Sequence, residues 1–153
     1  MVIRIYMDTC CFNRPFDNQS QPAVYDEAQA VLKIQDGIIE GRHDLVWSYV
    51  LDREIFRTSD AVRKYEMLLW GDIACYVIKR KTAAIETLSN KLQGMGIKLF
   101  DPLHIACAVD LSCDCFITTD HKLLITPIHV INVIGPMTFL KLFTEGGFTD
   151  GNV

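Results

Sequence analysis

Positive charge is scarce in this 153-residue chain, which carries 15 Lys and Arg against 19 Asp and Glu, a net charge of −4. This balance excludes a protein that coats nucleic acid through a uniformly basic surface. The six cysteines form no C-x-x-C pair, the spacing typical of zinc and dithiol sites. A dinucleotide-binding fingerprint is also missing, because Gly94-Met95-Gly96 is better explained as a helix stop.

An uninterrupted apolar span of membrane-crossing length is absent as well. The charge-free stretch from Leu123 to Leu140 is broken by Pro127, Gly135 and Pro136, so it predicts a turn, a strand and a helix start. The first seven residues are too short, and wrongly flanked, for a signal peptide. We therefore expect a cytoplasmic protein with no membrane segment.

Half of the residues are hydrophobic, which at this length suits one compact domain. Short apolar runs alternate with apolar residues at helical spacing, and this alternation predicts an α/β fold. The expected architecture is a three-layer sandwich around a central, mainly parallel sheet of four or five strands. The domain is expected to cover residues 1–144, with a flexible C-terminal tail at 145–153. Strands are predicted at 2–7, 45–47, 115–118 and 129–133.

Two helices in the middle of the chain are predicted to face the core. One follows the stripe Val62, Tyr65, Leu69, Ile73 and Tyr76, and the other runs from Ile85 through Leu92 to Met95. The segment from Met67 to Tyr76 is apolar all round, which exceeds the needs of a single buried stripe. This excess motivates the expectation of a homodimer.

Four acidic residues occupy positions that a parallel sheet would bring together. Asp8 and Asp120 each follow a predicted strand, and ligands of open α/β sheets bind beyond the carboxyl ends of strands. Glu54 lies in the segment leaving the second strand, and Asp101 stands at a helix start, where the helix dipole favours negative charge. Bunched carboxylates repel one another unless a cation lies between them. Oxygen ligands alone favour Mg²⁺ or Mn²⁺, and phosphodiester hydrolysis is the natural chemistry.

The order of these pieces resembles the PIN-domain family of metal-dependent ribonucleases, which includes the VapC-like toxins of toxin–antitoxin pairs. The similarity spans nearly the whole chain. It rests on Tyr6-Met-Asp-Thr9, the step from Ser48 to Glu54, Asp101-Pro-Leu-His-Ile-Ala106, Phe116-Ile-Thr-Thr-Asp120 and Val130-Ile-Asn132. No piece is specific alone, but their joint order and spacing are.

The resemblance implies a metal-dependent endoribonuclease that hydrolyses RNA, with a small antitoxin protein as partner. The implied catalytic and metal-binding residues are Asp8, Glu54, Asp101 and Asp120. We expect Asp8 and Asp101 to hold the main ion, and Glu54 and Asp120 to act through water or on a second ion.

Three further residues are candidates for roles around this site. Thr118 is a candidate for an assisting role. Many relatives carry Asn or Ser soon after the first Asp, where this chain has Cys10 and Cys11, and Asn13 is the candidate substitute. Arg14 is a candidate for RNA binding, because its loop follows Asp8.

Each residue also has a plainer structural interpretation. Asp101 before Pro102 has the pattern of a helix cap. Asp52 competes with Glu54, although two positions apart they face different sides of a helix. A histidine in a buried helix, such as His104, is more often packed and hydrogen-bonded than catalytic. Asp114 fits a turn better than a ligand role.

Arg53, Arg57 and the run Lys79-Arg80-Lys81 could contact phosphates, but such charges usually form a solvated face.

Two other functions remain open on the sequence. One is a catalytically silent module of the same fold that binds RNA or a protein. The other is a phosphatase with an aspartate nucleophile, which would require a second Asp two positions after the first, where this chain has Cys10.

Overall fold

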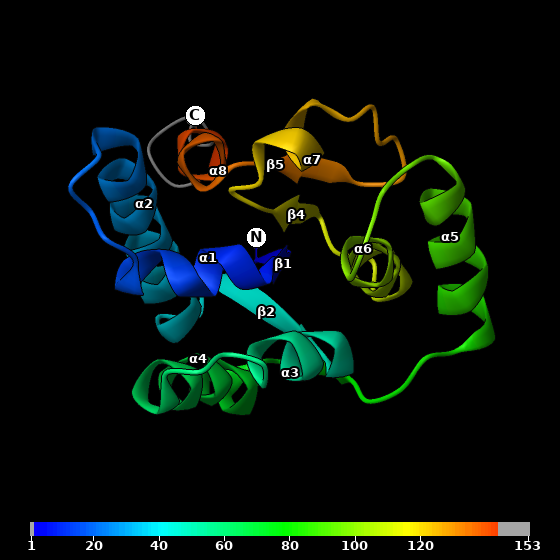
Figure 1. Cartoon of the computed structure of the whole chain (residues 1–153), viewed down its shortest axis with the longest axis horizontal. Coiled ribbons are helices and arrows are strands. Elements are labelled where there is room, and N and C mark those ends of the chain that lie inside the picture. The colour runs from blue at the N-terminus through cyan, green and yellow to red at the C-terminus, as the bar shows by residue number, and fades with distance from the viewer. Residues whose placement is uncertain (1, 144–153) are drawn as a thin grey trace.

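The computed structural model describes residues 2–143, which form a five-stranded, all-parallel sheet between layers of helices (Figure 1). The strand order is β3-β2-β1-β4-β5. The strands are β1 (Ile3–Met7), β2 (His43–Ser48), β3 (Tyr76–Ile78), β4 (Cys115–Ile117) and β5 (Asn132–Ile134). The predicted α/β class with a parallel sheet of four or five strands is confirmed. The predicted tail at 145–153, and the domain boundary at 144, lie outside the described residues.

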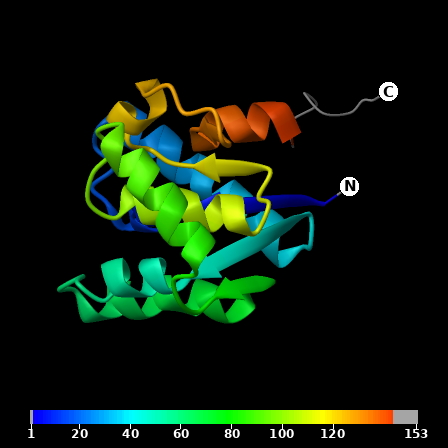
Figure 2. The ribbon, with the colours of Figure 1, turned by 90° about the vertical axis from the view of Figure 1, so that its right-hand side faces the viewer.

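Helices cover both faces of the sheet. α2 (Pro22–Ile39) and α8 (Pro136–Phe143) pack together on one face, and α6 (Asp101–Asp110) packs on the other beneath α5 (Ala83–Gly94) (Figure 1). α3 (Tyr49–Ile55) and α4 (Ala61–Ile73) lie beside β2, at the opposite end of the sheet from α8 (Figure 2). Among residues 2–143, no helix combines the length and apolar character that crossing a membrane would require.

The strand register fixes which residues meet at the carboxyl edge of the sheet. Met7 pairs with Ile117, so Asp8 and Thr118 become neighbours across β1 and β4. On the other side of β1, Tyr6 pairs with Val46, two residues before the end of β2 at Ser48. Ser48 accepts a hydrogen bond from the Leu51 N–H and so caps α3. The central strands are nearly continuous apolar runs, because helices cover both of their faces.

Several predicted elements differ from those observed. The prediction of a helix that extends to Tyr76 is wrong at its C-terminal end, because α4 ends at Ile73 and Tyr76 is the first residue of β3. This strand has three residues, too few for a periodic pattern to be recognised in the sequence. The apolar stripe of the same predicted helix does not face the core. Val62 and Tyr65 are 71% and 65% exposed, while Met67 is buried. By contrast, Ile85 and Leu92 of the α5 stripe are buried as expected, whereas Met95, which lies just beyond the end of α5, is 50% exposed.

Short helices account for most of the other differences. The loop expected after Asp8 contains α1 (Thr9–Asn13) and the 3₁₀ helix η1 (Arg14–Phe16), and the turn expected after Asp120 contains α7 (His121–Ile125). The last strand is shifted, since it starts at Asn132 rather than His129. Five-residue helices are stabilised by caps and packing more than by propensity, so apolar spacing gives little sign of them.

His43, at the start of β2, is a buried imidazole on the edge of the sheet opposite to the acids. It is 3% exposed, neither ring nitrogen has a hydrogen-bond partner, and its ring meets Phe139 edge to face at 5.0 Å. The ring occupies the space beside Gly37, where an added Cβ would lie 2.5 Å from it. Burial, and next the charge of Arg42, lowers the pKa of His43. The folded protein therefore keeps this ring neutral.

We predict that the free energy of unfolding of His43→Phe, relative to that of the wild type, rises as the pH drops from 7 to 5, because the variant lacks the destabilisation that His43 causes there. The unfolded chain takes up a proton at an ordinary histidine pKa, whereas the folded His43 resists it, so protons favour unfolding. One such proton contributes at most about 1.4 kcal/mol per pH unit. Urea denaturation at several pH values measures the slope. Equal slopes in both proteins would contradict this account.

Candidate functional site

Asp8 lies at the end of β1 and is only 5% exposed. Its Oδ1 accepts a hydrogen bond from the Thr9 N–H at 2.8 Å, which caps α1. Its Oδ2 accepts from the Thr118 hydroxyl at 2.8 Å and from the Cys10 thiol at 3.5 Å. Cys10 and Thr118 therefore supply the polar contacts around Asp8, and the cysteine that departs from the family pattern faces this carboxylate.

Glu54 is held by a chain of hydrogen bonds that crosses the whole site. Its Oε1 accepts from the Thr9 hydroxyl at 2.5 Å and lies 2.7 Å from His104 Nε2. On the other side of the ring, His104 Nδ1 lies 2.6 Å from the Tyr6 hydroxyl, which in turn lies 2.6 Å from Ser48 Oγ. Tyr6, Ser48 and His104 are fully buried.

The direction of these hydrogen bonds assigns a role to His104. A carboxylate can only accept, so Nε2 donates to Glu54, while Nδ1 is hydrogen-bonded to the Tyr6 hydroxyl. Both nitrogens are thus committed, and the ring positions Glu54. The expectation of a packed, hydrogen-bonded histidine is confirmed. The sequence analysis included Tyr6, Ser48 and Thr9 in its matching segments but assigned them no role in the site. In the sequence, the only sign of their role is that they are polar residues close to the acids at the strand ends.

Asp101 and Asp120 border the same site from two helices. The predicted helix start at Asp101 is confirmed, since α6 begins there, but the alternative interpretation of Asp101 as its cap does not hold, because Phe100 occupies the cap position and no side chain makes a cap hydrogen bond there. Among the described residues, no hydrogen bond or ion pair reaches the Asp101 carboxylate. Asp120 does cap α7, where its Oδ1 accepts from the N–H groups of Lys122 and Leu123. Its Oδ2 has no such partner.

The electrostatics show that these carboxylates share one field. Burial, and then neighbouring negative groups, raises the pKa of Asp8 to about 8. Burial, followed by the charges of Asp8, Asp120 and Glu54, raises the pKa of Asp101 to about 7. Burial would also raise the pKa of Glu54, but hydrogen bonds from His104 and Thr9 outweigh it and lower that pKa. The hydrogen-bond donors within the site therefore do not neutralise all of its negative charge.

The donor set fits a divalent cation. Ligand atoms of Asp8, Glu54 and His104 lie within 4.8 Å of one another, while Asp101 and Asp120 stand outside this tightest group but are coupled to it by charge. Glu54 Oε2, both Asp101 oxygens and Asp120 Oδ2 have no hydrogen-bond partner in the described part of the chain. Mg²⁺ and Mn²⁺ bind carboxylate oxygens, and such an ion would occupy the space between these mutually repelling acids.

Other predicted residues lie near this centre but are engaged elsewhere. The Asn13 amide donates to the Thr9 carbonyl oxygen and accepts from Arg63. Arg14 forms ion pairs with Asp17 and Glu27.

Two acids that were set aside do lie away from the site. Asp52 accepts a hydrogen bond from the Trp47 indole N–H at 2.8 Å, so it faces away from Glu54. Asp114 accepts from the Arg4 backbone N–H near the start of β1, at the opposite edge of the sheet. Both observations agree with the sequence interpretation.

A hollow of about 610 Å³ opens beside the acids. Asp101 and Asp120 form part of its wall together with Lys98, Lys122 and the exposed Leu99. Leu99 is 94% exposed and adopts a left-handed φ of 62°, a conformation that costs a non-glycine residue energy. Space for a substrate is therefore present next to two of the predicted ligands.

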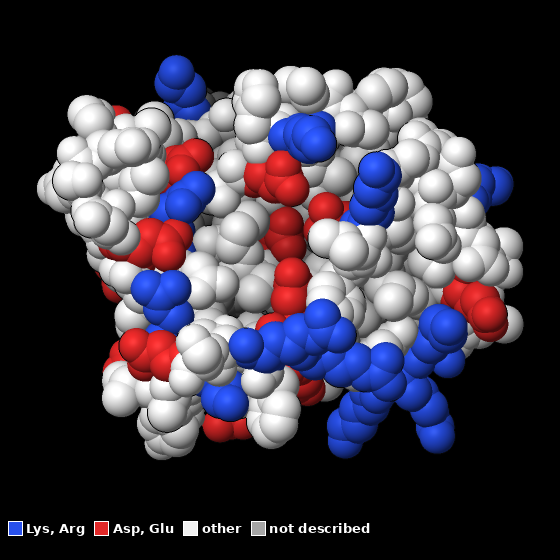
Figure 3. Space-filling model, in the orientation of Figure 1, with Lys and Arg blue, Asp and Glu red and all other residues white. Residues whose placement is uncertain are grey.

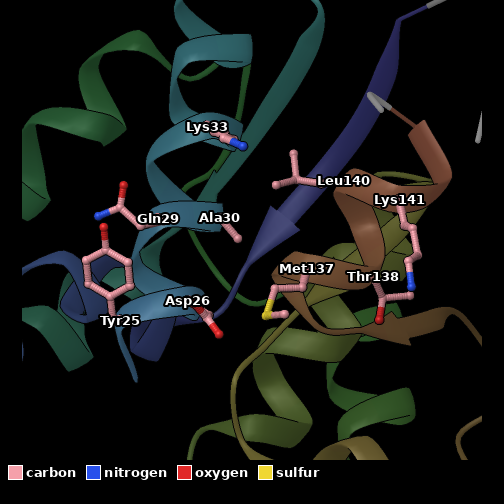
Figure 4. Close-up of a pocket in the computed structure, with 9 residues that line it drawn as sticks. All are labelled: Tyr25, Asp26, Gln29, Ala30, Lys33, Met137, Thr138, Leu140 and Lys141. Atoms are coloured by element: carbon pink, nitrogen blue, oxygen red, sulfur yellow. The ribbon is translucent and has the colours of Figure 1, made fainter. Parts of the chain in front are cut away.

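A second hollow, of about 580 Å³, lies between α2 and α8 (Figure 4). Asp26 is the sole carboxylate in its wall, so it lacks the donors of a metal site. Its other lining residues are Tyr25, Gln29, Ala30, Lys33, Met137, Thr138, Leu140 and Lys141.

Comparison with known proteins supports the fold. A solved structure of VapBC2 from Rickettsia felis, bound to a DNA fragment from its promoter, contains a chain of similar fold. The match has a TM-score of 0.53 and 11% sequence identity, and it covers 87% of this chain and 98% of that one. No family model and no curated protein matches this sequence. At this identity the likeness shows the fold alone, and that fold agrees with the PIN-like α/β architecture expected from the sequence.

We predict that Mg²⁺ or Mn²⁺ stabilises the protein, and does so more at pH 8.5 than at pH 6. Protons compete for Asp8 and Asp101 below their raised pKa values, and deprotonation as the pH rises through about 7 to 8 frees the oxygens for the ion. At 100 times Kd the gain is about 2.7 kcal/mol, or about 5–10 °C in Tm.

Differential scanning calorimetry at both pH values measures this shift. Asp101→Asn should reduce it, whereas Asp110→Asn, an exposed position at the far end of α6, serves as the matched control. A shift that is the same at both pH values, or unchanged in Asp101→Asn, would count against the site.

Proposed function

We propose that this chain is a divalent-metal-dependent endoribonuclease that hydrolyses RNA phosphodiester bonds and acts as the toxin of a toxin–antitoxin pair. The observation that carries the proposal is the cluster of under-neutralised carboxylates at the carboxyl edge of an all-parallel sheet. The fold likeness to a chain of VapBC2, a toxin–antitoxin complex, supports the same assignment.

The proposed roles follow from the position of each acid. Asp8 and Asp101 hold the main ion, because both are buried enough to raise their pKa values and Asp101 has no other partner. Glu54 and Asp120 act through bound water or on a second ion. When bound, the ion supplies a water of lowered pKa and stabilises charge on the phosphate oxygens.

The supporting residues are assigned to orientation. His104 fixes one oxygen of Glu54 and leaves the other facing the site, while Thr9 shares that fixed oxygen. Thr118 and Cys10 hold Asp8 Oδ2. Such outer contacts keep ligands in place as an ion binds.

We predict that Asp101→Asn lowers the rate of RNA cleavage by about 100-fold or more, because it removes charge at the ion without removing a structural hydrogen bond. A fluorescent single-stranded RNA incubated with Mg²⁺ or Mn²⁺ reports cleavage, and EDTA should abolish it. Asp110→Asn is the control for an equal change of charge on the same helix.

The toxin role has its own readout in cells. Expression of the wild-type chain should arrest growth, Asp101→Asn should not, and the product of a short neighbouring reading frame should release the arrest. If calorimetry detects no divalent ion while RNA still binds, the chain is instead a catalytically silent RNA-binding module, and the nuclease proposal fails.

We also propose that the chain forms a homodimer through the exposed face of α4. Val62, Tyr65, Leu69 and Ile73 recur along this face and are 71%, 65%, 42% and 49% exposed. A contiguous apolar stripe on a surface helix is typical of a protein–protein contact. The sequence expectation of a dimer rested on the overlapping segment from Met67 to Tyr76, which shares Leu69 and Ile73 with this face.

We predict that Leu69→Lys converts a dimer to a monomer without unfolding it, since a buried ammonium at the interface would be unpaired. Sedimentation equilibrium measures the mass. The control is Ile125→Lys, a comparably exposed apolar position on α7. A wild-type protein that remains monomeric at high concentration would refute the dimer.

A further inference from the structure

A hollow of about 470 Å³ adjoins the acids on the side of α3. The Arg57 guanidinium lies over the Phe100 ring at 5.0 Å, and Phe100 directly precedes Asp101. Phe56, which also lines this hollow, is 69% exposed. An exposed ring and a guanidinium stacked on a second ring form flat surfaces of the kind on which nucleic-acid bases stack.

A second hollow, of about 270 Å³, continues from the first and shares Arg53 with it. Its wall contains Lys79, Arg80 and Lys81, which follow β3, and the Tyr49 ring lies under Arg53 at 5.2 Å. Five cations therefore line two adjoining hollows. We call this region the Arg53 surface, defined by Arg53, Phe56, Arg57, Phe100 and residues 79–81.

The cations of the Arg53 surface are unpaired. In residues 2–143, no salt bridge joins Arg53, Arg57 or residues 79–81 to a carboxylate, although Arg14 forms two and Arg42 and Arg63 form one each. The one acid in these walls, Asp52, is bound to the Trp47 indole. Such a concentration of exposed, uncompensated positive charge is notable in a chain of net charge −4.

The Arg53 surface is also continuous with the acidic site. Arg57 follows Glu54 by one helical turn, and its backbone N–H donates to the Glu54 carbonyl oxygen. Lys and Arg gather beside the row of Asp and Glu on the face that looks onto the carboxyl edge of the sheet (Figure 3). A strand whose phosphate lies at the acids would leave the site over Phe100 and Arg57.

We propose that the Arg53 surface binds a single-stranded segment of RNA next to the cleaved phosphate, with backbone phosphates on Arg53 and residues 79–81 and bases stacked on Phe56 and on the Arg57 guanidinium that covers Phe100. Single strands fit this surface because the bases of a duplex are stacked on each other and cannot reach the rings. An acidic protein segment would use the cations but not the exposed rings. The inference rests on the proposed ribonuclease function and names the form of its substrate.

The electrostatic half of the proposal is tested by binding in EDTA, where no cleavage occurs. A fluorescent single-stranded RNA is titrated at several salt concentrations with the wild type, with Lys79→Ala/Lys81→Ala and with the control Lys33→Ala/Lys141→Ala. The salt slope should fall by about 1.4 in the first variant, since each single-strand phosphate contact contributes about 0.7. It should not change in the control, which removes the same charge from α2 and α8.

The stacking half is tested with Phe56→Leu, whose matched control is Phe16→Leu. Each of these two rings lies under one cation, Lys64 at 4.8 Å over Phe56 and Arg63 at 5.6 Å over Phe16. Phe56→Leu should weaken single-strand binding by about tenfold, with little effect on a duplex of the same sequence. Phe16→Leu should leave both unchanged.

Two results would overturn the proposal. One is an unchanged salt slope in Lys79→Ala/Lys81→Ala, and the other is binding of polyglutamate as tight as that of RNA and equally weakened by the lysine substitutions. The readout is independent of catalysis. If Asp101→Asn still cleaves RNA while these variants lose binding, the metal-site assignment fails and the Arg53 surface stands. If Asp101→Asn is inactive and binding is unaffected by the Lys79 and Phe56 substitutions, this inference alone fails.

Discussion

Mutual repulsion between carboxylates that are largely removed from water is the constraint on which this structure depends. Asp8 is almost fully buried, and its charge adds to those of Glu54 and Asp120 in raising the pKa of Asp101. Without a cation, the site can relieve this repulsion only by taking up protons, as the raised pKa values show. In the metal-free protein these carboxyls favour folding at low pH, and that contribution is lost as the pH rises through about 7 to 8. A bound divalent ion would remove the repulsion and keep the acids ionised.

The fold holds the acids against this repulsion through contacts between distant parts of the chain. The pairing of β1 with β4 places Thr118 beside Asp8, and the Asp8 N–H donates to the Ile117 carbonyl oxygen at 2.8 Å. Tyr6 and His104, from the first strand and from α6, then fix Glu54 through one imidazole. The sheet therefore sets the spacing of the acids, and the buried hydrogen-bond chain sets the orientation of one of them. Loss of the strand pairing or of the hydrogen-bond chain would leave the acids close together but without a defined arrangement.

The parallel sheet and the convergence of acids at one edge could be predicted, because both follow from local patterns: apolar runs that end in Asp, and Pro102 after Asp101. The hydrogen-bond chain could not, because the pairing of Tyr6 with His104 depends on which helix covers which strand. β3 was missed for a related reason, since three residues carry too little periodicity. The outward face of α4 was misassigned because an apolar stripe looks the same whether it contacts the core or a partner.

The distribution of ion pairs connects the acidic site with the cations beside it. Arg14, Arg42 and Arg63 are neutralised by nearby carboxylates, whereas Arg53, Arg57 and residues 79–81 are not. The net charge of −4 conceals this division, because the surplus of acid lies in one cluster that an ion would compensate. Before an ion binds, the acids repel a phosphate and the Arg53 surface attracts it. Under the proposed function, RNA would reach the Arg53 surface without metal, and its backbone would approach the acids only after an ion had reversed the sign of the field there.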